Sequence, residues 1–226
     1  MISPSVVPNT LTALNLSCGV LSIIKAIEKD FLLSGVFILL AMLADAFDGR
    51  AARYFKVSGE FGKELDSLSD VVSFGVAPAI LIYQMHFKEF TFPFLFVTVV
   101  FAVCAEMRLA RFNVDVQNVE GYFMGLPSPA AGCTLATFAI SGIMIDPVYV
   151  AAGTLITGLL MYSKVRYPDF KGKGNPIKKP AVLVGVIWAA YMLYTFPLIA
   201  LPFIGFFAYL SVGIVNYIYV QFTGGY

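Results

Sequence analysis

Four aspartates in one short stretch of the sequence have the residue type and spacing of a metal site. Asp45 and Asp48 lie three residues apart and Asp66 and Asp70 lie four apart, so on helices each pair shares one face. The loop between the pairs is short enough to bring the two helices back as antiparallel neighbours. Four converging carboxylates repel one another unless a cation lies between them, and hard oxygen ligands suit Mg²⁺, Mn²⁺ or Ca²⁺.

Small residues and one arginine accompany these aspartates. Gly49 and Ala52 follow the first aspartate by four and seven residues, and Gly62 precedes the third by four. Faces without bulky side chains let a nucleotide or a second backbone approach closely, and Arg53 offers a bidentate grip on a phosphate. The alternative interpretation is that the small residues only tighten helix packing in a membrane.

The composition indicates that these charges belong to a membrane protein. Hydrophobic residues make up 59% of the 226 residues and charged residues 13%, with a mean hydropathy of +0.82, whereas soluble domains are about 25% charged. The apolar runs are continuous, so we predict an all-α, polytopic membrane bundle forming a single domain over 1–226. The eight expected transmembrane helices are 10–27, 31–54, 66–85, 91–112, 127–145, 147–163, 180–195 and 198–220.

The distribution of Lys and Arg predicts the orientation of this bundle. With eight crossings, twelve of the 15 basic residues gather at the aspartate end, and only Lys25, Lys29 and Lys88 lie at the other. We therefore expect both termini and the aspartates on the cytoplasmic side. The most basic loop, 164–179, either only sets the topology or also attracts anionic lipid headgroups. His86 is expected in an outer loop. The net charge of +1 says nothing about an acidic partner, and no nucleic-acid partner is expected.

The pattern D-x2-D-G-x2-A-R-x8-G-x3-D-x3-D, over residues 45–70, resembles the signature of the CDP-alcohol phosphatidyltransferase family. The resemblance implies a site for two Mg²⁺ or Mn²⁺ ions held by the first three aspartates, while Asp70 adds to the metal site and acts as the general base. It also implies a homodimer among membrane lipids, and we expect a prokaryotic plasma membrane. The expected CDP-lipid pocket comprises Gly49, Ala52, Arg53, Gly62, Asn9 and Thr12.

Four further segments resemble the branch of that family that uses serine as acceptor. They are residues 8–15 (PNTLTALN), 73–79 (SFGVAPA), 108–113 (RLARFN) and 125–129 (GLPSP). The resemblance implies CDP-diacylglycerol and L-serine as substrates, with phosphatidylserine and CMP formed by direct displacement.

The acceptor pocket is expected at the end of the fourth helix. Arg108 and Arg111 share one face there, and Asn113 offers an amide at the same level. The arginines either hold the carboxylate of serine or only end the helix at the headgroup boundary. A phosphorylated acceptor, such as glycerol 3-phosphate or inositol phosphate, also needs a basic pocket. Asn9, Thr12 and Asn15, at helical intervals, either meet the nucleoside or cap and pack the first helix.

Two other functional classes place aspartates in a membrane. An intramembrane prenyltransferase also uses Mg²⁺ with paired aspartate motifs, but on separated helices, whereas the motif here is compact. A cation transporter has its site near the bilayer midplane on broken helices, whereas these aspartates are expected near the cytoplasmic helix ends. A requirement for a CDP-linked lipid distinguishes the transferase from both.

Overall fold

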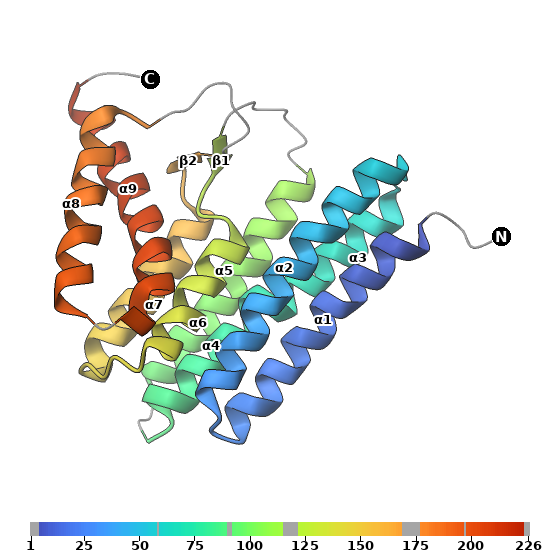
Figure 1. The fold of residues 1–226 in the computed structure, drawn as a ribbon, viewed down its shortest axis with the longest axis horizontal. Coiled ribbons are helices and arrows are strands. Elements are labelled where there is room, and N and C mark those ends of the chain that lie inside the picture. Colours follow the sequence, from blue (N-terminus) through green and yellow to red (C-terminus); the bar gives the residue numbers. More distant parts are fainter. Residues whose placement is uncertain are drawn as a thin grey trace.

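The computed structural model describes residues 5–57, 59–89, 92–114, 122–168, 177–196 and 198–223. Within them the chain is mostly helical, with two short strands (Figure 1). The elements in chain order are α1 (Val6–Ile27), α2 (Phe31–Phe55), α3 (Glu60–Asp70), η1 (Val71–Val76), α4 (Ala77–Ile82), η2 (Tyr83–Phe87), α5 (Phe94–Val114), β1 (Tyr122–Met124), α6 (Ser128–Ser141), α7 (Pro147–Tyr162), β2 (Arg166–Pro168), α8 (Lys179–Thr195), η3 (Leu198–Ala200) and α9 (Leu201–Thr223).

These helical elements join into eight rods. The four elements from Glu60 to Phe87 follow one another without a break, and η3 continues into α9. Counted in this way, the described residues form eight rods at the positions of the eight predicted helices. Successive rods run in opposite directions, so the start of α1 and the end of α9 lie at the same end of the bundle (Figure 1).

Among the described residues, four rods are long and apolar enough to cross a membrane, namely Val6–Ile27, Phe31–Phe55, Glu60–Phe87 and Leu198–Thr223. Large apolar side chains cover the outer surface, among them Leu43, Val103, Ile187 and Tyr194. A surface of this kind faces lipid rather than water. The expected helical bundle is therefore confirmed, whereas eight membrane crossings stay a prediction.

The rod ends follow ordinary rules of helix termination. Asp30 and Asp146 precede α2 and α7 and accept a hydrogen bond from the backbone N–H of Leu33 (3.1 Å) and Val148 (2.8 Å). Proline lies in the first turn of α6, α7 and α8, where its missing N–H costs nothing.

The third rod differs from the prediction at both ends. It begins at Glu60 rather than at residue 66, because a polar, amphipathic turn precedes the apolar run and Glu60 complements the helix dipole. At its other end, η2 continues the rod through His86, so the prediction of an outer loop there was wrong. The His86 ring is buried and stacked on Phe138, with 5.6 Å between ring centroids.

Two π-helical turns interrupt the α-helical geometry of this rod, and η1 directly follows Asp70. Gly19 of α1 packs so closely on Ser73 of η1 that a Cβ at position 19 would overlap the serine. Ser73 Oγ also donates to the Asn15 carbonyl at 3.0 Å. These contacts fix α1 against the third rod in the turn that directly follows Asp70.

A two-stranded ribbon covers one end of the bundle. β1 and β2 pair antiparallel, with Phe123 opposite Tyr167. Tyr167 is fully buried against Gly213 of α9 and donates to the Leu210 carbonyl at 3.3 Å. Burial raises the pKa of Tyr167, so its hydroxyl stays protonated and keeps this bond.

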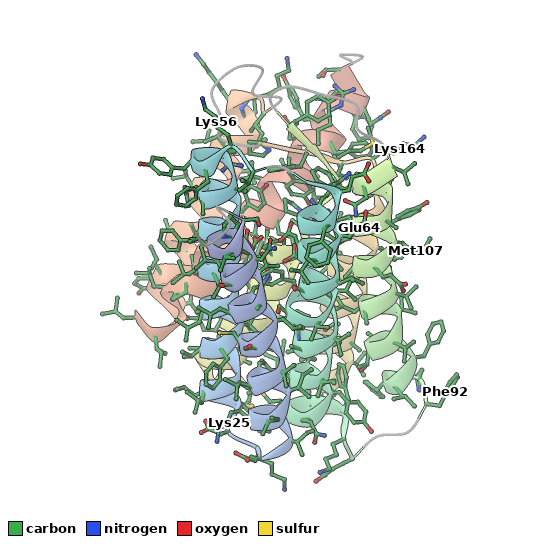
Figure 2. All side chains as sticks on the ribbon, turned by 90° about the vertical axis from the view of Figure 1, so that its right-hand side faces the viewer. Lys25, Lys56, Glu64, Phe92, Met107 and Lys164 are labelled. Atoms are coloured by element: carbon green, nitrogen blue, oxygen red, sulfur yellow. The ribbon has the colours of Figure 1, made fainter. Side chains whose placement is uncertain are left out.

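Labelled lysines mark the two ends of the bundle. Lys56 and Lys164 lie at one end, whereas Lys25 and Phe92 lie at the other (Figure 2). This agrees with the sorting expected from the sequence. Part of the basic loop, including Lys171 and Lys173, lies outside the described residues.

Candidate active site

The first three aspartates of the motif come together between α2 and α3. Asp45, Asp48 and Asp66 each offer a carboxylate oxygen, and these oxygens lie within 4.8 Å of one another. Asp48 is buried, and its Oδ2 accepts a hydrogen bond from Thr12 Oγ1 at 2.7 Å. Asp66 Oδ1 is also buried and has no hydrogen-bond partner among the described residues.

A cluster of this composition fits a divalent cation. Like charges at this separation repel, and a buried carboxylate oxygen without a partner is costly. No direct ion pair joins the aspartates to Lys or Arg within the part of the chain that the structure describes. Carboxylate oxygens are the ligands that Mg²⁺ and Mn²⁺ prefer. The three side chains are therefore suited to hold such an ion.

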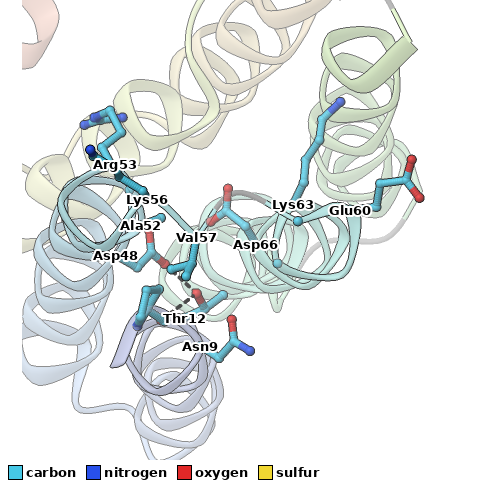
Figure 3. Close-up of a pocket in the computed structure, with 14 residues that line it drawn as sticks. Asn9, Thr12, Asp48, Ala52, Arg53, Lys56, Val57, Glu60, Lys63 and Asp66 are labelled. Atoms are coloured by element: carbon cyan, nitrogen blue, oxygen red, sulfur yellow. Dashed lines mark hydrogen bonds between the residues drawn. The ribbon is translucent and has the colours of Figure 1, made fainter. Parts of the chain in front are cut away.

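A pocket of about 610 Å³ opens beside this cluster (Figure 3). We call it the aspartate pocket. Its walls come from α1, α2 and α3, and Asp48 and Asp66 face it from opposite sides. The lining residues are Pro8, Asn9, Thr12, Asp48, Gly49, Ala52, Arg53, Lys56, Val57, Gly59, Glu60, Gly62, Lys63 and Asp66.

All six residues expected to contact the CDP-linked lipid line this pocket. Two glycines keep its walls open. A Cβ at Gly49 would meet only Arg53 Nη1, and one at Gly62 only Asn9 Oδ1, each at 3.7 Å. The structure thus brings the small residues to a ligand-sized space rather than to a tight helix contact.

The fourth aspartate, Asp70, lies one helical turn beyond Asp66 on α3. It is buried at the end of α3, and its Oδ1 accepts a hydrogen bond from Asn15 Nδ2 at 2.9 Å. Asn15 is itself fully buried, and its Oδ1 has no partner among the described residues. The sequence places Asn15 on one helix face with Asn9 and Thr12, but this spacing did not indicate that Asn15 donates to Asp70.

Arg108 brings a positive charge to the inner side of the aspartates. Its side chain is 7% exposed, and its Nη1 donates to Ser128 Oγ at 3.1 Å. Its charge acts on both Asp45 and Asp70, although no direct ion pair joins them in the described residues. A small polar ligand between these groups would find a cation on one side and carboxylates on the other.

Arg111 and Asn113 are placed differently from Arg108. Arg111 donates to four backbone carbonyls, at Met124, Met161, Tyr162 and Ser163. The Asn113 side chain donates to Ser67 Oγ at 2.9 Å, and the Asn113 backbone carbonyl accepts from Lys63 Nζ, also at 2.9 Å.

The contacts of these two residues join helices. Those of Asn113 tie α5 to α3, and those of Arg111 tie α5 to the end of α7. Of the three residues expected in the acceptor pocket, Arg108 is the one whose charge acts on the aspartates among the described residues.

Lys56 and Lys63 also line the pocket and were not among its expected residues. Lys56 adds a positive charge beside Arg53, whereas the ammonium of Lys63 donates to the Asn113 backbone carbonyl. Lysines near a helix end at the membrane surface are common, so residue type and spacing alone gave no signal for them.

The chain matches the model of the CDP-alcohol phosphatidyltransferase family over residues 5–215. It is similar to the CDP-diacylglycerol–serine O-phosphatidyltransferase of Bacillus subtilis, with 35% identity over 165 residues, 73% of this chain and 91% of the relative. The Helicobacter pylori protein of the same name is 32% identical over 226 residues, 95% of this chain and 92% of the relative. The archaetidylserine synthase of Methanothermobacter thermautotrophicus is 39% identical over 170 residues, 74% of this chain and 71% of the relative.

Proposed function

Because the chain belongs to the CDP-alcohol phosphatidyltransferase family, we propose that it transfers the phosphatidyl group of CDP-diacylglycerol to L-serine, giving phosphatidylserine and CMP. The names of the bacterial relatives support serine as the acceptor. One structural observation carries the proposal: six of the eight fixed residues of the family signature, all but Asp45 and Asp70, line a single pocket that has carboxylates on both sides.

The aspartates are the proposed metal site. Asp45, Asp48 and Asp66, together with Asp70, would hold two divalent cations, Mg²⁺ or Mn²⁺. Such ions neutralise the charge that builds on the transferred phosphoryl group and on the leaving nucleotide. The Thr12 hydroxyl fixes one oxygen of Asp48, which leaves its other oxygen for the ion.

The aspartate pocket is the proposed site for the CDP-linked lipid. Gly49, Ala52 and Gly62 give the nucleotide room, and Asn9 offers an amide on the facing wall. Arg53 supplies a charge for the diphosphate. A guanidinium presents several N–H groups in a plane and suits phosphate oxygens better than an ammonium does.

Asp70 is the proposed general base. It takes the proton from the serine hydroxyl as that oxygen attacks the phosphorus attached to the lipid. The bond from this phosphorus to the CMP oxygen breaks in the same step, and CMP leaves. Asn15 holds Oδ1 of Asp70, which orients the carboxylate and leaves its other oxygen to accept the proton.

Arg108 is the proposed partner of the serine carboxylate. It lies close enough to act on Asp70, so a serine whose carboxylate binds Arg108 can present its hydroxyl to the base. This arrangement also accommodates a phosphorylated acceptor, for which a second cation would be expected nearby. We therefore retain other alcohols as the alternative acceptor.

We propose that the whole chain is one membrane domain with eight crossings. Both termini and the active site would face the cytoplasm, because most basic residues gather at that end. A homodimer is the assembly expected from the resemblance, and a prokaryotic plasma membrane, with an internal membrane as the alternative, is the expected location. Reaction of a membrane-impermeant reagent with single cysteines placed at Lys56 and Lys25 tests this orientation.

The decisive experiment measures CMP release by the purified protein in detergent. CDP-diacylglycerol and Mg²⁺ or Mn²⁺ are supplied with serine, glycerol 3-phosphate, inositol or inositol phosphate in separate reactions. We expect CMP with serine alone, and none after chelation of the metal. CMP with another acceptor would change the substrate, and a folded protein that does not bind CDP-diacylglycerol would refute the transferase.

A further inference from the structure

Arg111 forms an unusual set of contacts at the end of α5. Its guanidinium donates to the carbonyls of Tyr162 (2.8 Å), Met124 (3.2 Å), Met161 (3.3 Å) and Ser163 (3.3 Å). It also lies over the Tyr162 ring, 4.7 Å from the centroid. We call this group of contacts the Arg111 cap. All of its partners are backbone carbonyls or a ring face, so the cap involves no charged partner.

The cap satisfies groups that the α7 helix leaves without partners. The last carbonyls of a helix have no intrahelical donors, and a cation at this end complements the helix dipole. Three of the four carbonyls are at the end of α7, and the fourth, from Met124, is in β1. A lysine offers one point of attachment and cannot bridge these carbonyls as a planar guanidinium does.

The segment that follows Met124 is fixed to the same helix end. The backbone N–H of Gly125 donates to the Val165 carbonyl at 2.8 Å, and that of Leu126 donates to the Leu160 carbonyl at 3.0 Å. Gly125 has φ +79°, and a Cβ there would overlap the Met161 carbonyl. The path of the chain into α6 is therefore set by its contacts with α7.

This path leads directly to Arg108. Ser128, the first residue of α6, is fully buried, and its Oγ accepts the hydrogen bond from Arg108 Nη1 at 3.1 Å. Ser128 is only four residues beyond Met124, whose carbonyl Arg111 holds. Movement of this segment away from α7 would carry Ser128 away and release the Arg108 guanidinium.

We propose that Arg111 and Ser128 are positioning residues for Arg108, which contacts the acceptor while they do not. The inference rests on the proposed function, in which Arg108 binds the carboxylate of serine. Arg111 fixes the segment before α6, and the Ser128 hydroxyl then holds the Arg108 guanidinium. The two arginines, one helical turn apart, thus have separate tasks.

The test is a set of KM and kcat measurements on Arg108→Lys, Arg111→Lys and Ser128→Ala, alone and combined with Arg108→Lys. We expect Arg108→Lys to raise the KM for serine about 10- to 100-fold, because a charge-assisted bidentate contact is lost. Arg111→Lys and Ser128→Ala should each raise it about 3- to 10-fold, with the KM for CDP-diacylglycerol unchanged. In the Arg108→Lys background, neither should add a further increase.

Ser141→Ala is the matched control, because it removes a buried hydroxyl at the other end of α6, where Ser141 bonds the Phe138 carbonyl. Its serine KM should equal that of the wild type. If Arg111→Lys does not fold, Ser128→Ala carries the test alone. An unchanged serine KM in Ser128→Ala, a parallel rise in the lipid KM, or additive effects in the double variants would overturn the proposal.

The wild type is measured first, so that the two inferences can fail separately. CMP release with a different acceptor would refute serine as substrate. The same variants would then be compared through the KM of that acceptor, and coupling to Arg108 would still support the positioning roles.

Discussion

The aspartate pocket and the Arg111 cap both place charged side chains at the same end of the bundle, but they differ in how their polar atoms are used. In the pocket, Asp66 Oδ1 is buried without a partner among the described residues, and neighbouring carboxylates face one another. In the cap, one guanidinium donates to four carbonyls.

Whether polar atoms have partners within the protein distinguishes residues that are available to bind a ligand from residues that stabilise the fold. A buried polar group without a partner costs about 1–3 kcal/mol, so it persists where a ligand supplies the missing contact. A group whose hydrogen bonds all go to the backbone has little left for a substrate. Arg108, with one hydrogen bond to Ser128 in the described residues, resembles the pocket more than the cap.

The largest effect should come from Asp66→Asn. Loss of a carboxylate from the metal site should lower kcat/KM by at least about a thousandfold, equivalent to several kcal/mol of transition-state stabilisation. A second measurement does not depend on activity: Mn²⁺ should raise the thermal midpoint of the wild type in detergent but not that of the variant. Glu64→Gln, on the exposed side of α3, is the control. A variant that keeps its Mn²⁺ response would remove Asp66 from the metal site.

Asp70→Asn should come next, because it removes the base and keeps the shape of the side chain. We expect turnover to fall about 10²- to 10⁴-fold. Equilibrium binding of CDP-diacylglycerol should stay within a small factor of the wild type, since the aspartate pocket is lined without Asp70. Turnover near the wild-type rate would contradict the assignment of the base.

Gly125→Ala probes the Arg111 cap through stability. A Cβ at this position would overlap the Met161 carbonyl and approach Arg111 Nη2 at 3.0 Å. The cost should exceed the roughly 1–2 kcal/mol of a left-handed non-glycine residue and appear as a lower thermal midpoint. Gly142→Ala is the matched control, with φ +65° and no atom within 4 Å of its Cβ. Equal losses in the two variants would show that the cap is not tightly packed.

The smallest effect should come from Gly62, where the pocket wall is open. Gly62→Ala should bind substrate normally and gain up to about 1 kcal/mol of helix stability. Gly62→Leu should extend into the pocket and raise the KM for CDP-diacylglycerol about 10-fold, with the serine KM unchanged. A leucine variant with wild-type lipid KM would place the nucleotide elsewhere.

Much of the fold could be predicted from the sequence, because continuous apolar runs have one stable conformation in lipid. The rods agree with the predicted helices, including the short α7 (Pro147–Tyr162, predicted 147–163). The error at Glu60 arose because α3 begins as a polar helix, which hydropathy does not detect. β1 and β2 gave no signal, since three-residue strands pair across segments far apart in the chain.

The site was predictable in part for a similar reason. The motif residues lie on two consecutive helices, so helical periodicity alone places their side chains together. The bond between Asn15 and Asp70 joins residues 55 apart in the sequence, and nothing local encodes it. The contacts of Arg111 were beyond prediction because its partners are backbone carbonyls, which every residue carries.

The π turn of η1 has a consequence for the phase of the third rod. An α-helix advances by about 100° per residue, and a π turn accommodates one extra residue without breaking the helix. If the same residues wound as a regular α-helix, with none removed, every side chain on one side of the turn would rotate relative to the other side by about one residue's advance. Asp66 and Asp70 would then turn away from α2 while Leu81 kept its buried place, whereas deleting one residue between Val71 and Val76 would keep both sides in phase. The alignment of the two halves of the motif therefore depends on the helical phase that this short turn sets, as well as on the identity of the aspartates.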